Sequence, residues 1–325
     1  MKTQLATPVV TKAAAEAEIT LSWAEIAGAT AYEVEADGVV VTVTGNGYTH
    51  AGLNPGTAHT YKVRAKSDTN VSVWSTVINA NTVPSKPGVI TGTATSNRIV
   101  LSWPAVPGAT KYDVERNGTI VVSPTTATAT LSSLQPDQDY TIRVRAKNAG
   151  GDGVWSDAVT VKTLLSTPVI TNVPSDTEIT LNWAEIAGAT SYEVEADGVV
   201  VSANGLSYTH TGLVSGTTHK YRVRAKSDVN VSDWSTLVTT YTVPGKVGVV
   251  TGTSTSTTVV LSWPTVPGAT RYDVERNGVV VVSPTGASAT LSGLQPDQDY
   301  TIRVRAKNTG GNGDWSDSIV VKTQL

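Results

Sequence analysis

The sequence predicts an all-β chain that is divided into four small modules, and three observations carry this prediction. The tetrapeptide KTQL at residues 2–5 returns as KTLL at 162–165 and as KTQL at 322–325, so the chain repeats every 160 residues. Each repeat divides again, because LSW at 21–23 recurs at 101–103 and 261–263, with LNW at 181–183. Within a module, apolar and polar residues alternate with the period of two that is typical of half-buried strands.

The four modules follow an A-B-A-B order. The first and third share AEIAGAT, YEVEADGVVV and VRAKSD, whereas the second and fourth share VPGAT, YDVERNG and LQPDQDYTIRVRAKN. We expect module boundaries at 1–83, 84–163, 164–243 and 244–325. Two whole periods plus four residues of a third are also what a stretch of a longer array of the same unit would contain, so we expect such an array.

The strand signals run in order through each module. Ile19, Leu21 and Trp23 alternate with Thr20 and Ser22, which predicts a strand with one buried face. The next alternating run, 32–36, leads into Asp-Gly at 37–38 and a valine run at 39–41, and Asp-Gly favours a tight hairpin turn. No stretch shows a sustained helical period.

Composition excludes several classes of function. With 24 basic and 27 acidic residues, the chain has a net charge of -3 and lacks the excess of basic residues that binding to nucleic acid or to an anionic membrane requires. The absence of Cys rules out disulfides and thiolate chemistry. No apolar run reaches the length of a membrane span, so we expect no membrane insertion. The first residues lack the basic and apolar regions of a secretory signal, so we expect any targeting segment to lie outside this sequence.

The modules resemble the fibronectin type III domain, in the versions common in bacterial extracellular proteins. The resemblance rests on a Trp in strand B, a Tyr in strand C at 32, 112, 192 and 272, a Leu-x-Pro before strand F, and a late Trp-Ser. It implies four disulfide-free, seven-stranded immunoglobulin-like sandwiches at the cell surface or outside the cell. The strand-B tryptophans are the expected core residues: Trp23, Trp103, Trp183 and Trp263.

A structural tyrosine of such sandwiches is replaced in the A modules. Tyr140 and Tyr300 of the B modules align with His59 and His219. In this fold the tyrosine hydroxyl bonds back to nearby backbone, and we expect one imidazole nitrogen to do the same. Tyr61 and Tyr221, two residues later, are expected to supply the lost aromatic bulk.

All four histidines, His50, His59, His210 and His219, lie in A modules at matching positions, and a metal site is one interpretation. Against it, no Asp or Cys lies at ligand spacing along the chain, and His50 aligns with the core-facing Leu131. Packing and capping are therefore the favoured explanation, and we expect neither a metal nor any other cofactor.

Charged residues are also expected to have a structural role. The outward Glu33 and Glu35 of strand C should face the outward Lys62 and Arg64 of strand F, and the B modules repeat the arrangement. Catalytic acid–base pairs need carboxylates that converge in a cleft, so we expect no catalytic residue and no enzyme.

The second tryptophan of each module is expected to start the last strand, to lie outward and to stack on an arginine. This resembles the tryptophan–arginine ladder of cytokine-receptor modules, and it is favoured over a platform for sugar rings. The expected pairs are Trp74 with Arg64, Trp155 with Arg145, Trp234 with Arg224, and Trp315 with Arg305.

Short linkers and strands of about eight to ten residues predict an extended rod of about 30 Å per module, or about 120 Å for four. Two functions remain open. The first is a structural spacer or fibre segment whose partners are neighbouring modules. The second is an adhesion module that recognises a protein or glycan through loops such as 68–73 and 148–154. Self-association into filaments stays open as well, because the valine-rich runs at 39–43, 120–122, 199–201 and 279–282 are expected near sheet edges, although core packing would explain most of these valines.

Overall fold

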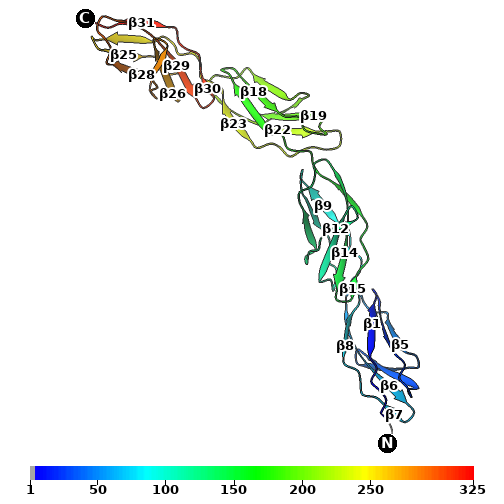
Figure 1. The fold of residues 1–325 in the computed structure, drawn as a ribbon. Coiled ribbons are helices and arrows are strands. Elements are labelled where there is room, and N and C mark those ends of the chain that lie inside the picture. Colours follow the sequence, from blue (N-terminus) through cyan, green and yellow to red (C-terminus); the bar gives the residue numbers. More distant parts are fainter. Residues whose placement is uncertain (1–3) are drawn as a thin grey trace. The chain divides into compact units, whose positions relative to one another are not determined.

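A computed structural model describes residues 4–325, and every regular element in it is a β-strand. The chain forms two compact units, one that ends at Leu164 and one that begins at Leu165. Figure 1 shows that each unit contains two β-rich modules in series. Within the described part of the chain, no helix is long and apolar enough to cross a membrane.

The first unit contains sixteen strand segments. The first module has β1 (Val10–Ala14), β2 (Glu18–Trp23), β3 (Ala31–Ala36), β4 (Val39–Val43), β5 (Gly47–Ala51), β6 (Ala58–Ser67), β7 (Asn70–Val71) and β8 (Ile78–Asn81). The second has β9 (Thr91–Ala94), β10 (Ile99–Ser102), β11 (Lys111–Arg116), β12 (Thr119–Val122), β13 (Thr128–Leu131), β14 (Asp139–Asn148), β15 (Gly151–Asp152) and β16 (Val159–Lys162).

The second unit repeats the pattern. The third module has β17 (Ile170–Pro174), β18 (Glu178–Trp183), β19 (Ser191–Ala196), β20 (Val199–Ala203), β21 (Ser207–Thr211), β22 (Thr218–Lys226) and β23 (Val238–Tyr241). The fourth has β24 (Thr251–Ser254), β25 (Thr258–Ser262), β26 (Arg271–Arg276), β27 (Val279–Val282), β28 (Ser288–Ser292), β29 (Asp299–Asn308), β30 (Gly311–Asn312) and β31 (Ile319–Lys322).

Each module is a sandwich of two antiparallel sheets. In the first module the three-stranded sheet has the order β1-β2-β5, and the larger sheet has the order β4-β3-β6-β7 with β8 also paired to β6. The second and fourth modules keep this arrangement, and in the third module the larger sheet has four strands in the order β20-β19-β22-β23. The immunoglobulin-like, all-β prediction is confirmed.

Four separate hydrophobic clusters fill the sandwiches. In the first module Ile19 and Leu21 are fully buried and Trp23 is 6% exposed. The ring of Trp23 lies 5.3 Å from that of Tyr32, whose hydroxyl accepts a hydrogen bond from the Ile26 N–H. The tryptophans at 103, 183 and 263 occupy the same place in their own clusters.

The prediction that the second tryptophan starts the last strand is wrong. Trp74 lies between β7 and β8, and β8 begins only at Ile78. The break has a local cause, because Ser72 Oγ and Ser75 Oγ accept the backbone N–H groups of Ala65 and Val63 on β6. These side-chain bonds interrupt the ladder that a continuous strand would make.

The valine-rich runs lie at sheet edges, as expected. β4, β12, β20 and β27 each end the order of their sheet. Core packing does not explain most of their valines, however, since Val39 is 65% exposed and all four residues of β27 are exposed. Only one face of each of these strands packs against the core of its module, and in β27 the side chains on that face are exposed as well.

Candidate functional site

One group of side chains lies on the outer face of the larger sheet. In the first module the guanidinium carbon of Arg64 lies 4.5 Å from the centre of the Trp74 ring, and Lys62 Nζ lies 5.7 Å from it. In the other modules two arginines approach each ring, at 4.5–4.9 Å: Arg143 and Arg145 on Trp155, Arg222 and Arg224 on Trp234, and Arg303 and Arg305 on Trp315. Cations therefore already occupy the indole faces that a sugar ring would need.

Carboxylates complete this face. Glu33 lies opposite Arg64 in the strand register, and it accepts hydrogen bonds from Arg64 Nε at 2.7 Å and from Lys66 Nζ at 2.8 Å. The bonds from Lys66 and Arg64 hold the pKa of Glu33 below its usual value. Glu35 pairs with Lys62 in the same way, so the predicted pairing of strands C and F is confirmed.

The B modules bury their acidic residue more deeply. The side chain of Asp113 is only 5% exposed and accepts bonds from Ser123 Oγ and from two nitrogens of Arg145. Burial alone would raise the pKa of Asp113, but the bonds from Ser123, Arg145 and Lys147 outweigh burial and lower it. These carboxylates are ionised and paired, which suits a structural role and not proton transfer.

A second group lies where strand F begins, and it differs between the A and B modules. Tyr140 accepts a hydrogen bond from the Gln135 N–H at 2.9 Å, and Tyr300 accepts the same bond from Gln295 at 3.0 Å. His59 and His219 do not bond to backbone in this way. His59 Nε2 instead lies 2.7 Å from Thr57 Oγ1, which donates to the carbonyl oxygen of Asn54. The threonine hydroxyl thus stands between the imidazole and the backbone.

The other nitrogen of His59 faces a carboxylate. His59 Nδ1 lies 2.6 Å from Asp37 Oδ2, and the second oxygen of Asp37 accepts the Thr60 N–H at 2.8 Å. Burial favours a higher pKa for Asp37, but the hydrogen bonds from His59 and from Thr60 outweigh it, so the pKa is lowered. Asp197 and His219 repeat this geometry in the third module.

His50 and Tyr61 form the inner part of the group. His50 Nδ1 shares a 3.1 Å hydrogen bond with the hydroxyl of Tyr61, which is 1% exposed and whose pKa is raised by burial. The rings of His50 and His59 meet edge to face, with centres 5.7 Å apart. In the second module Leu131 and Ile142 take the places of His50 and Tyr61, so an apolar pair replaces the half-buried histidine and the buried tyrosine of the first module.

The sequence argument that no Asp accompanies the histidines is wrong. One donor atom from each of Asp37, His50 and His59 lies within 4.8 Å of the others, and Asp197, His210 and His219 form the second such group. Asp37 is distant along the chain but belongs to the Asp-Gly turn between β3 and β4, and β3 pairs with β6, which carries His59. The predicted adjacency of strands C and F, together with the predicted Asp-Gly turn after strand C, contained the signal for this contact.

Within each unit the A module and the B module meet in a defined joint. Asn148, at the end of β14, donates from Nδ2 to the carbonyl oxygen of Thr82 at 2.8 Å, and its Oδ1 accepts the Gly150 N–H at 2.8 Å. The backbones of Gly56 and Gly108 also touch, because a Cβ on Gly108 would overlap the Gly56 carbonyl. In the second unit Asn308 donates to Thr242 at 2.9 Å in the same way.

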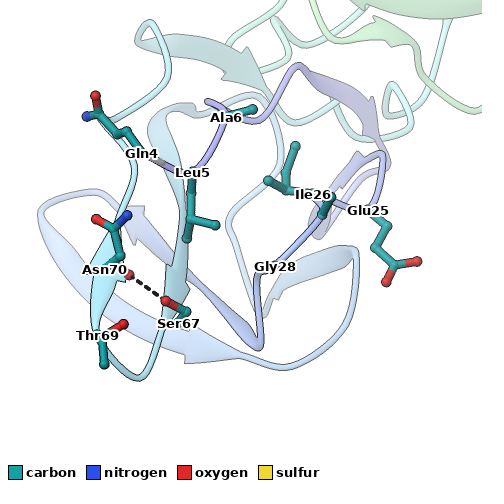
Figure 2. A pocket seen from close by; sticks show the side chains of 10 residues that line it. Gln4, Leu5, Ala6, Glu25, Ile26, Gly28, Ser67, Thr69 and Asn70 are labelled. Atoms are coloured by element: carbon teal, nitrogen blue, oxygen red, sulfur yellow. Dashed lines mark hydrogen bonds between the residues drawn. The ribbon is translucent and has the colours of Figure 1, made fainter. Parts of the chain in front are cut away.

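A pocket of about 720 Å³ lies at one end of the first module (Figure 2). Leu5 and Ile26 give it an apolar wall, and Gln4 and Glu25 belong to its polar rim. Figure 2 shows Ser67 bonded to Asn70 within the loop that closes one side. Glu25 is the one acidic residue of the lining and no basic residue belongs to it, so the pocket assembles no paired catalytic groups.

These features define the protein's class: it consists of immunoglobulin-like β-sandwiches in tandem, and the charged side chains on its larger sheets pair with one another. Comparison with known families agrees with this class and narrows it to one family. The sequence model described as "Fibronectin type III domain" matches residues 84–162 and 243–322. The second and fourth modules are therefore fibronectin type III domains.

Several bacterial proteins are similar to this chain. Exoglucanase B of Cellulomonas fimi is 32% identical over 271 residues, which cover 72% of this chain and 24% of that protein. Endoglucanase B of Cellulomonas fimi is 32% identical over 366 residues, with coverages of 90% and 35%. Chitinase A1 of Niallia circulans is 34% identical over 168 residues, with coverages of 46% and 24%. The chain therefore spans only about a quarter to about a third of these relatives.

Proposed function

We propose that the chain is a non-catalytic spacer segment of a longer extracellular protein. The relatives are named for acting on glucans and chitin, which are polymers too large to enter a cell, and the chain matches only a minor part of each relative. An enzyme of this kind needs its catalytic part held at a distance from its other parts. Small sandwiches in series supply that distance without any chemistry of their own.

The joint between modules is the observation that carries this proposal. Residues 148–154 of the second module belong to a loop that a ligand-binding role would need free. Asn148 and Gly150 instead lie against the end of the first module, at Thr82 and Asn81. A loop that packs against the neighbouring module restricts the motion of the two modules relative to each other, as a spacer requires. The same contacts recur in the second unit.

A sedimentation assay separates this function from glycan binding. The full chain is mixed with insoluble cellulose or chitin, the solid is removed, and the protein left in solution is measured. A spacer stays in solution at the level of a serum albumin control. Depletion that is saturable and is lost in Trp155→Ala with Trp315→Ala would establish the aromatic faces as a sugar platform and overturn the spacer proposal.

Self-assembly is the second candidate function, and the exposed edge strands favour it. Val39 and Val199 are each more than 60% exposed on strands that end their sheets, so their backbone groups are open to another strand. Light scattering over a concentration series tests this. A constant mass of 33.9 kDa supports the spacer, whereas a mass that rises with concentration and falls back in Val39→Lys with Val199→Lys would make assembly the function.

A further inference from the structure

We propose that each A module binds one zinc ion, or a chemically similar divalent transition metal, through Asp37, His50 and His59 in the first module and Asp197, His210 and His219 in the third. Two imidazoles and one carboxylate, with a water in the fourth position, are a donor set that zinc accepts in proteins. The donor atoms lie within 4.8 Å of one another, and tetrahedral zinc needs donors about 3.3 Å apart. On metal binding, His59 Nδ1 and Asp37 Oδ2, now 2.6 Å apart, would separate, and the more distant donors would move inward toward this spacing.

The hydrogen bonds fix which nitrogen of His59 faces the metal position. Thr57 Oγ1 donates its only proton to Asn54, so it accepts one from His59, which places that proton on Nε2. Nδ1 then points at Asp37 Oδ2, and both atoms are acceptors unless a cation lies between them. A second imidazole proton is one such cation, and a metal ion is the other.

His50 is held in a matching way. Its Nδ1 is engaged by the hydroxyl of Tyr61, which leaves Nε2 as the nitrogen for the metal. The oxygen of the Tyr61 hydroxyl can accept the proton on Nδ1 of His50.

All three ligands therefore have a partner behind them. Thr57 holds His59, Tyr61 holds His50, and the Thr60 N–H holds the second oxygen of Asp37. Outer partners that fix the tautomer and orientation of the ligands are typical of metal sites in proteins.

Exposure suits a site that water can reach. The side chain of His59 is 12% exposed and that of Asp37 is 39% exposed. Imidazole nitrogens favour zinc over calcium or magnesium, which take oxygen ligands.

The B modules are a natural control. They carry Asn117, Leu131 and Tyr140 where the first module has Asp37, His50 and His59, and they form the same fold with none of the three donors. Substitutions that copy the B residues into the A modules are therefore compatible with this sandwich.

Calorimetric titration of the full chain, without any histidine tag, with zinc chloride tests the proposal. We expect two zinc ions per chain for the wild type, one for Asp37→Asn, and none for Asp37→Asn with Asp197→Asn. Asn117 shows that an asparagine at this turn still accepts the backbone N–H, so this variant keeps the turn. Calcium and magnesium chloride are expected to give no binding.

A second pair of variants tests the outer partners. Thr57→Val with Thr217→Val is expected to weaken zinc binding by about 10- to 100-fold while the stoichiometry stays at two. Near-ultraviolet circular dichroism checks that each variant is folded. A wild type that binds no zinc, or an aspartate double variant that still binds two ions with unchanged affinity, overturns the proposal.

Discussion

The joint between the first two modules gives the sharpest mechanical prediction. Asn148→Ala removes the bond from Nδ2 to Thr82 and the bond from the Gly150 N–H to Oδ1. Only the bond to Thr82 crosses the joint, and one such bond contributes about 0.5–1.5 kcal/mol net, which is about 2- to 13-fold in the ratio of docked to undocked joints. The substitution should therefore increase the motion between the two modules without unfolding either of them.

Distance measurement between two spin labels reports this motion directly, and the absence of native cysteine makes labelling simple. Cysteines at Thr44 and Thr125 place one label on an exposed loop of each module. We expect a narrow distance distribution for the parent chain and a clearly broader one for Asn148→Ala.

Two further variants sharpen the comparison. Asn148→Asp keeps the acceptor for Gly150 but turns a carboxylate oxygen toward the Thr82 carbonyl, so it should broaden the distribution at least as much. Ser67→Ala changes the corresponding loop of the first module and should leave the width unchanged. Equal widths for Asn148→Ala and the parent chain would refute the view that this side chain fixes the joint.

Three other perturbations test the interior of the modules. Tyr140→Phe leaves the Gln135 N–H without its acceptor and should lower the free energy of unfolding of the second module by about 1 kcal/mol, as measured by urea denaturation. Trp74→Ala should lose about 0.5–1 kcal/mol of stacking with Arg64 by the same assay, and an unchanged midpoint would show that the stack contributes nothing. Because its folded-state pKa is lowered, Asp113 should stabilise the fold above its ordinary value of 3.8 and lose that contribution as the pH falls toward the folded pKa. Asp113→Asn should therefore flatten the acid side of the stability profile, and an unaltered slope would count against the pairing.

Local pattern was sufficient for much of the fold. The period-two alternation around Trp23 and the Asp-Gly turn indicated the strands, and the adjacency of strands C and F predicted that the acidic side chains of one face the basic side chains of the other. These features depend on neighbours along one strand or across one strand pair, where side-chain direction is fixed by the pleat.

Features that depend on contacts between residues distant in the sequence, or between modules, were missed. The position of Asp37 beside His59 needs the turn after one strand to lie over the start of another. The break of the last strand near Trp74 depends on two serine side chains that replace ladder bonds. The joint at Asn148 depends on how one module meets the next, which no pattern within a single module contains.

Small-angle X-ray scattering of the full chain, with its mass checked by light scattering, tests the spacer proposal most directly. Four modules in line, about 120 Å long, predict a 33.9 kDa monomer with a radius of gyration of about 35 Å, against about 20 Å for a compact chain of 325 residues. A monomer with a radius of gyration of about 35 Å supports a chain whose function is to hold other parts of the protein at a distance. A monomer near the smaller value would mean that the modules fold back on one another, and the spacer proposal would be wrong.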